Sequence, residues 1–195
     1  MDMAVHAHKE LDDARIAFKA MESSKSLDDF EKHWKEYLHS LERIWSKSVA
    51  HFGLCSSWNG WKGRYESLRK KDPLLNYLTN ARGAEEHTVA EITAREESSL
   101  SFKAGPTGSA VIKRITIMKD GTLSVFGDGS LVFAFSPGRI KLLPIVNRGR
   151  NYPIPSKHLG QSVLSDNVLE VAQAGINFYE SFLADADEFF RDKKI

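Results

Sequence analysis

The apolar residues of this chain change their spacing twice along the sequence, and this change limits the folds that it can adopt. Before about residue 98 they recur every three or four positions, which is the period of an amphipathic helix. From 98 to 150 they partly alternate with polar residues, as in strands, and the helical period returns near the end. We therefore predict an α+β, mainly helical fold, in which an antiparallel helix bundle carries an inserted antiparallel β-meander.

The ends of several helical segments are marked by residues that cap helices. Ser26 is followed three positions later by Asp29, in the manner of a capping box, and Gly53 is a suitable stop for that helix. Asp72 can cap the next long segment, where Pro73 suits the first helical position because it has no N–H to lose. We expect helices over residues 4–23, 26–53, 58–71, 72–94 and 165–191.

Turn-forming residues divide the middle of the chain into short apolar segments. The turn formers include Gly105-Pro106, Gly127-Asp128-Gly129 and Ser136-Pro137-Gly138. The segments between them predict a meander of four or five strands, over residues 99–104, 110–118, 122–126, 130–135 and 139–146. Pro153 and Pro155 favour an extended linker over 147–162. The expected organisation is a helical part at 1–97, a β insertion at 98–150, and a linker with the last helix at 151–195.

Composition narrows the class of protein. The 195 residues are 42% hydrophobic, which is enough for one buried core, and a net charge of +1 argues against a protein that coats nucleic acid through overall charge. Cys55 is the only cysteine, so no intramolecular disulfide can form and a reducing compartment is expected. No apolar run is long enough to span a bilayer, so we expect a soluble, cytoplasmic protein without a membrane partner. The His6 and His8 pair lacks a third ligand nearby, so neither a metal nor a cofactor is predicted.

Aromatic and basic residues interleave over residues 58–71. The basic residues Lys62, Arg64, Arg69 and Lys70 alternate with Trp58, Trp61 and Tyr65. Such a surface can stack bases and hold phosphates, so these four basic residues are candidates for binding RNA. The same spacing also describes an ordinary amphipathic helix whose basic face is solvated.

The only catalytic candidates are Arg82 and His87, which the 72–94 helix carries as Arg82-Gly83-Ala84-Glu85-Glu86-His87, after the apolar run LLNYLTNA. This segment resembles the HEPN superfamily, helical-bundle proteins whose nuclease members carry R-x(4–6)-H in a core helix. The family commonly has a polar residue directly after the arginine, where this chain has Gly83. A second interpretation pairs Arg82 with Glu86 on the helix surface and leaves Glu85 solvated.

The resemblance implies a metal-independent endoribonuclease that acts as a homodimer, often as a toxin with a neutralising antitoxin-like protein, or in antiphage defence. RNA carries its own nucleophile, the 2′-hydroxyl. His87 would act as general acid or base, and Arg82 would stabilise the charge on the phosphate. The alternative is a noncatalytic binding or adaptor protein that uses the β insertion as its partner surface.

Overall fold

The computed structural model describes residues 4–87, 91–106, 108, 110–118, 123–129, 131–164 and 166–192. Helices make up most of the regular structure in these residues, which confirms the α+β, mainly helical fold. The helices are α1 (Ala4–Glu22), α2 (Leu27–Phe52), α3 (Trp58–Lys71), α4 (Pro73–His87) and α5 (Val168–Phe190). None of the helices in the described residues is long and apolar enough to cross a membrane.

The strands are short and lie between α4 and α5. They are β1 (Thr93–Glu96), β2 (Ser99–Ala104), β3 (Ala110–Ile117), β4 (Leu123–Gly129), β5 (Leu131–Ser136), β6 (Arg139–Leu142), β7 (Ile145–Asn147), β8 (Arg150–Tyr152), β9 (Lys157–His158) and β10 (Gln161–Ser162). The chain divides into a helical unit, Met1–Arg95 with Ile140–Ile195, and a ribbon unit, Glu96–Arg139. Residues 140–150, which we predicted as part of the insertion, therefore belong to the helical unit.

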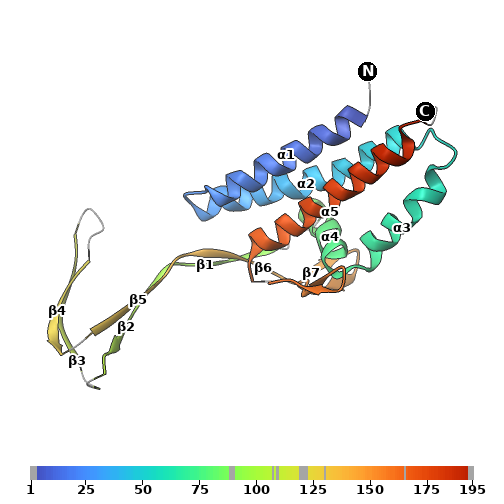
Figure 1. The fold of residues 1–195 in the computed structure, drawn as a ribbon. Coiled ribbons are helices and arrows are strands. Elements are labelled where there is room, and N and C mark those ends of the chain that lie inside the picture. Colours follow the sequence, from blue (N-terminus) through green and yellow to red (C-terminus); the bar gives the residue numbers. More distant parts are fainter. Residues whose placement is uncertain are drawn as a thin grey trace. The chain divides into compact units, whose positions relative to one another are not determined.

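The core of the helical unit lies among α1, α2 and α5, which run alongside one another, and it is extended by α3 and α4 (Figure 1). Aromatic side chains join α3 to the ends of α2 and α5. The buried Trp58 ring lies 5.6 Å from Phe52, 5.4 Å from Trp61 and 5.8 Å from Phe190, measured between ring centroids. Because large apolar side chains contribute most to burial, this cluster fixes α3 against the unit.

The predicted helix ends are confirmed at several positions. The side chain of Ser26 accepts a hydrogen bond from the backbone N–H of Asp29, at 3.1 Å, and α4 begins at Pro73. The helix predicted over 72–94 is shorter than we expected, because Thr93 already belongs to β1. The β-branched Ile92 and Thr93 favour extended backbone over helix.

Two small hairpins replace the extended linker that we predicted over 147–162. The strand β7 pairs with β8 across Arg148 and Gly149, and β9 pairs with β10 across Leu159 and Gly160. All four turn residues have positive φ, at 50°, 72°, 48° and 84°, as a type I′ hairpin turn requires. The prediction failed because the first turn residue is Arg148 or Leu159 rather than Asn or Asp, so the usual Asn-Gly signal is missing.

The segment between β6 and β7 and the β9–β10 hairpin hold α4 in place. The Tyr77 hydroxyl donates to the backbone carbonyl of Leu143 at 2.7 Å. The buried Asp72 carboxylate, just before α4, accepts hydrogen bonds from the backbone N–H of Leu75 at 3.0 Å and of Leu159 at 2.7 Å, and contacts His158 Nδ1 at 2.9 Å. The helix that carries Arg82 is therefore fixed at its start by residues far along the chain.

The strands of the ribbon unit pair in nested order, which differs from the meander that we predicted. Among the described strands, β3 pairs with β4 and β2 pairs with β5, all antiparallel. Outside them β1 pairs with β6. The nested order puts Phe102 directly opposite Phe133, and their rings meet edge to face at 5.3 Å. Cross-strand aromatic pairs stabilise a sheet, and a meander with β2 beside β3 would not form this one.

Candidate functional site

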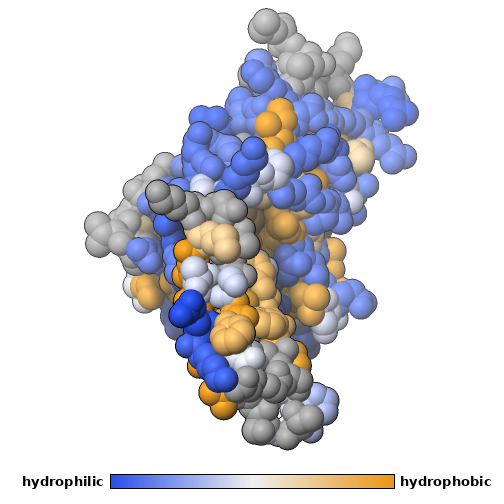
Figure 2. Space-filling view, turned by 90° about the vertical axis from the view of Figure 1, so that its left-hand side faces the viewer, coloured by the Kyte–Doolittle hydropathy of each residue, from blue (hydrophilic) through white to orange (hydrophobic). Residues whose placement is uncertain are grey.

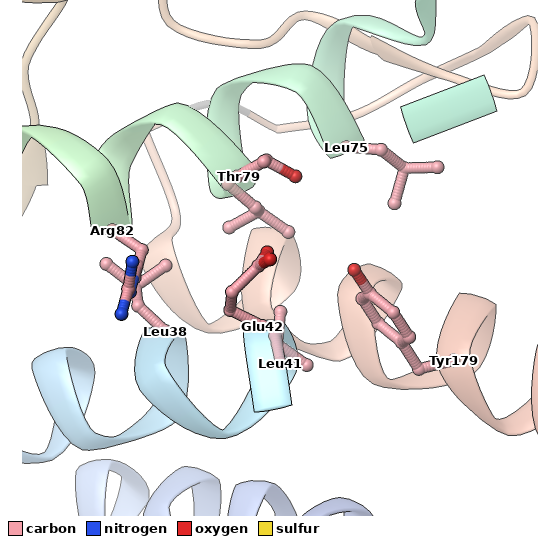
Figure 3. A pocket seen from close by; sticks show the side chains of 8 residues that line it. Leu38, Leu41, Glu42, Leu75, Thr79, Arg82 and Tyr179 are labelled. Atoms are coloured by element: carbon pink, nitrogen blue, oxygen red, sulfur yellow. The ribbon is translucent and has the colours of Figure 1, made fainter. Parts of the chain in front are cut away.

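Arg82 is half-buried on α4 and faces α2 and α5 (Figure 3). Its side chain borders a cavity that is also lined by Leu38, Leu41, Glu42, Leu75, Leu78, Thr79 and Tyr179. The cavity has a volume of about 10 Å³, which is room for about one water molecule. A nucleotide does not fit into it, so this cavity is not by itself a substrate site.

His87 is the last residue of α4, and its side chain and that of Glu86 lie outside the described residues. Glu85 is not solvated, in contrast to our second interpretation of the sequence. Its carboxylate lies 3.2 Å from His39 Nε2 and 3.4 Å from Lys35 Nζ, both on α2. These contacts join the candidate motif to α2, and no local pattern could have revealed them because the partners are distant in sequence.

Gly83, beside Arg82, is explained by the packing of β7 on α4. A Cβ atom at this position would lie 2.6 Å from the side-chain nitrogen of Asn147. Asn147 is buried, and that nitrogen donates to the side-chain oxygen of Asn80 at 3.0 Å. A side chain at position 83 would therefore displace a buried, hydrogen-bonded amide.

The basic residues of α3 have acidic partners in several cases. Arg64 donates to Asp185 at 3.1 Å, and Lys70 pairs with Glu66 at 2.8 Å. Lys62 is half-buried. Because carboxylates neutralise part of this positive charge, the attraction of α3 for a polyanion is weaker than the sequence suggests. These contacts favour the ordinary amphipathic helix over the RNA-binding surface.

Arg69, the other basic candidate on α3, lies inside the helical unit. Its side chain is only 10% exposed and donates to Glu42 at 2.5 Å and to the Tyr179 hydroxyl at 3.1 Å. The guanidinium also lies over the Trp45 ring, 4.3 Å from its centroid. Burial raises the pKa of Tyr179, so its hydroxyl stays neutral and accepts this hydrogen bond. Arg69 therefore serves packing and charge pairing in the fold.

An open hollow of about 450 Å³ lies along α2, lined by Asp28, Glu31, Lys32, Lys35, Glu36 and His39. Its charges have both signs, so it does not select for an anionic ligand. Within the described part of the chain, no group of three or more His, Cys, Asp or Glu residues could hold a metal ion.

No family model, curated protein or solved structure matches the chain.

The β2–β5 pair exposes an apolar surface that the sequence did not single out. Side chains alternate between the two faces of a strand, and directly paired residues share a face. One face, here called the apolar ribbon face, consists of Leu100, Phe102, Phe133 and Phe135. Phe133 is 51% exposed and Phe135 is 68% exposed. Hydrophobic residues are also visible at the surface in Figure 2.

The other face of the β2–β5 pair is largely polar, and consists of Ser99, Ser101, Lys103, Val132, Ala134 and Ser136. On the β3–β4 pair, Ile115 lies opposite Val125 on one face, while the 65% exposed Phe126 lies on the other face with Thr116 and Ser124, so this pair does not separate apolar from polar residues as clearly. Ile115 is 47% exposed and Ile117, on the same face, is 74% exposed. The alternation in SLSFKA and LVFAFS carries this signal, but the strand pairing is needed to combine both strands into one face.

Proposed function

We propose that this protein is a noncatalytic binding or adaptor protein whose ribbon unit is the partner surface. The observation that carries this proposal is the apolar ribbon face, where large apolar side chains from two strands lie together and exposed. Scattered exposed apolar residues are ordinary on protein surfaces, whereas grouped ones mark interaction sites.

The free energy available from burying the apolar ribbon face supports a partner for it. Fully burying a Leu or Phe side chain contributes about 1.5–3 kcal/mol, so the exposed Phe133 and Phe135 leave several kcal/mol for binding. Isolated two-stranded hairpins are at best marginally stable in water. A partner that covers the apolar ribbon face would supply the second layer that such a ribbon needs.

Photo-crosslinking in cells tests the proposal at two neighbouring positions of β5. Phe133 and Val132 are both 51% exposed but lie on opposite faces of the ribbon. With benzoylphenylalanine at position 133, we expect a crosslinked product of defined mass after irradiation, and at position 132 we expect none or far less. Equal crosslinking at both positions, or none at position 133, would contradict the proposal.

A second candidate function is the HEPN-like endoribonuclease. It is favoured by the placement of Arg82 and His87 on the single helix α4. In this proposal the RNA 2′-hydroxyl attacks the adjacent phosphorus to form a 2′,3′-cyclic phosphate, and the bond from phosphorus to the 5′-oxygen of the next nucleotide breaks. His87 takes the proton from the 2′-hydroxyl or donates one to the leaving 5′-oxygen, and Arg82 stabilises the added negative charge. No metal takes part in this chemistry.

RNA cleavage by the purified full chain tests the nuclease candidate. We expect His87→Ala to slow cleavage by about 10²–10⁴-fold, because that is the usual contribution of a general acid or base. The control is His33→Ala, which removes an imidazole of α2 whose Nδ1 lies 2.8 Å from the Glu36 carboxylate. Arg82→Lys tests the phosphate contact while keeping the positive charge in the partly buried site. Wild-type protein without cleavage activity, or equal activity in all variants, excludes the nuclease.

A further inference from the structure

We infer that the cavity beside α4 binds one water molecule, which accepts a hydrogen bond from the Tyr179 hydroxyl and donates one to the Glu42 carboxylate. The site lies inside the helical unit and does not depend on the proposed function. Its walls come from α2, α4 and α5 (Figure 3). The occupant is identified from the size of the cavity, its polar groups and the hydrogen bonds that these groups leave open.

The size and the lining of the cavity suit a single water molecule. Its volume of about 10 Å³ is close to the smallest that holds one water. Cavities that stay dry in proteins are lined by apolar groups alone, whereas polar ones hold water that makes about three hydrogen bonds. Here the side chains of Glu42, Thr79, Arg82 and Tyr179 bring polar atoms to a wall that otherwise consists of leucines. A wall of this kind selects water over an apolar ligand.

The Tyr179 hydroxyl has a proton for which the described residues offer no acceptor. Tyr179 is 3% exposed, and its hydroxyl oxygen accepts a hydrogen bond from Arg69 Nε at 3.1 Å. Burial raises the pKa of Tyr179, so the hydroxyl keeps its proton at neutral pH and can also donate. Because buried polar groups in proteins are nearly always hydrogen-bonded, this proton needs an acceptor, and a water in the cavity supplies it.

The Glu42 carboxylate is the matching acceptor for the water. Its Oε2 atom accepts from Arg69 Nη2 at 2.5 Å, and its Oε1 atom makes no hydrogen bond to a described residue. Nε and Nη2 belong to one planar guanidinium, so the Tyr179 and Glu42 oxygens that they contact lie near one another. Figure 3 shows the ends of both side chains directed into the space between the helices. A water that bridges them completes a ring of hydrogen bonds with Arg69.

The second proton of the water has an acceptor on α4. Thr79 lines the cavity, and its hydroxyl makes no hydrogen bond to a residue that the structure describes. A water that accepts from Tyr179 and donates to Glu42 and Thr79 makes the three hydrogen bonds that are usual for a buried water. This water joins α4 to α2 and α5 part-way along the helix that carries Arg82, in addition to the contacts of Asp72 at its start.

A crystal structure of the full chain, at a resolution that shows ordered waters, tests this inference. We expect one density peak in the cavity, within about 2.5–3.2 Å of both the Tyr179 hydroxyl oxygen and the Glu42 carboxylate. In Tyr179→Phe, which removes the donor, we expect the peak to lose most of its density. The matched control is Tyr37→Phe, because Tyr37 is equally buried but its hydroxyl donates directly to the backbone carbonyl of Ala172 at 2.7 Å. In this control the peak should stay unchanged.

Four outcomes would overturn the inference. In wild type these are a cavity without density, a Tyr179 hydroxyl that donates directly to Glu42, and a peak that contacts neither group. The fourth is an equally strong peak in Tyr179→Phe. Circular dichroism shows whether each variant is folded, and the wild-type structure decides the first three outcomes even if Tyr179→Phe does not fold.

Discussion

Replacing Arg69 with alanine is expected to lower the free energy of unfolding by about 3 kcal/mol, because the change breaks a largely buried ion pair. Glu42 would lose its cation, the buried Tyr179 hydroxyl would lose a donor, and Trp45 would lose the guanidinium above its ring. Leaving such groups without partners costs more than the pair contributes to stability. Urea denaturation of wild type and variant measures the difference.

Lys70→Ala is the control for Arg69→Ala. Lys70 is on the same helix, its side chain is 71% exposed, and its pair with Glu66 is an exposed one of the i, i+4 type. Such pairs contribute about 0.3–0.5 kcal/mol, so Lys70→Ala should change stability by no more than that. If Arg69→Ala lowers the free energy of unfolding as little as Lys70→Ala does, Arg69 does not have the structural role that its contacts indicate. An RNA-binding role for Arg69 then becomes the better interpretation.

Asp72→Ala is expected to destabilise the protein by about 2–3 kcal/mol near neutral pH, because it removes a helix cap and a buried carboxylate that several donors contact. The donors are the backbone N–H groups of Leu75 and Leu159, together with His158 at its contact to the carboxylate. Asp166→Ala, at an exposed position, is the control and should have an effect below about 0.5 kcal/mol.

The effect of Asp72 should also depend on pH. Burial on its own would raise the pKa of Asp72, but the hydrogen bonds from His158, Leu159 and Leu75 outweigh it, so the pKa is lowered in the folded protein. The contribution of Asp72 is therefore full above the unfolded-state pKa of about 3.9, and it is lost as the pH falls through the lower folded-state value. Urea denaturation at a series of pH values should show wild type and Asp72→Ala converging at acidic pH, and a constant difference would contradict this linkage.

The helices were predictable from sequence because their signals are local. The cap at Ser26, the start at Pro73 and the apolar spacing each involve residues within a few positions of one another. The positions of β2 to β5 were predictable for the same reason, whereas β1 and the strands after 147 were not. The pairing of strands was not, because Phe102 and Phe133 come from strands separated by another hairpin, and alternation alone does not choose between a meander and nested pairs.

The candidate site was harder to predict, since its contacts join distant segments. Arg69 has the sequence context of a solvated basic residue, and only its approach to Glu42 on another helix shows that it is internal. The contact of Glu85 with His39 likewise cannot be predicted from the residues between Arg82 and His87, because His39 lies on a different helix. The apolar ribbon face arises only after two strands are combined in one register.

Hydrogen–deuterium exchange of the β2 and β5 amides tests the central claim most directly, because a packed ribbon keeps its interstrand hydrogen bonds closed and a bare one opens readily. The measurement compares wild type with Phe133→Glu, each isolated under native conditions together with any partner that it retains, with the amides of α2 and α5 as an internal reference. We predict slow exchange in the wild-type ribbon, fast exchange in the variant ribbon, and no difference in the two helices. Equally fast exchange in both ribbons would contradict the claim that a partner covers this face.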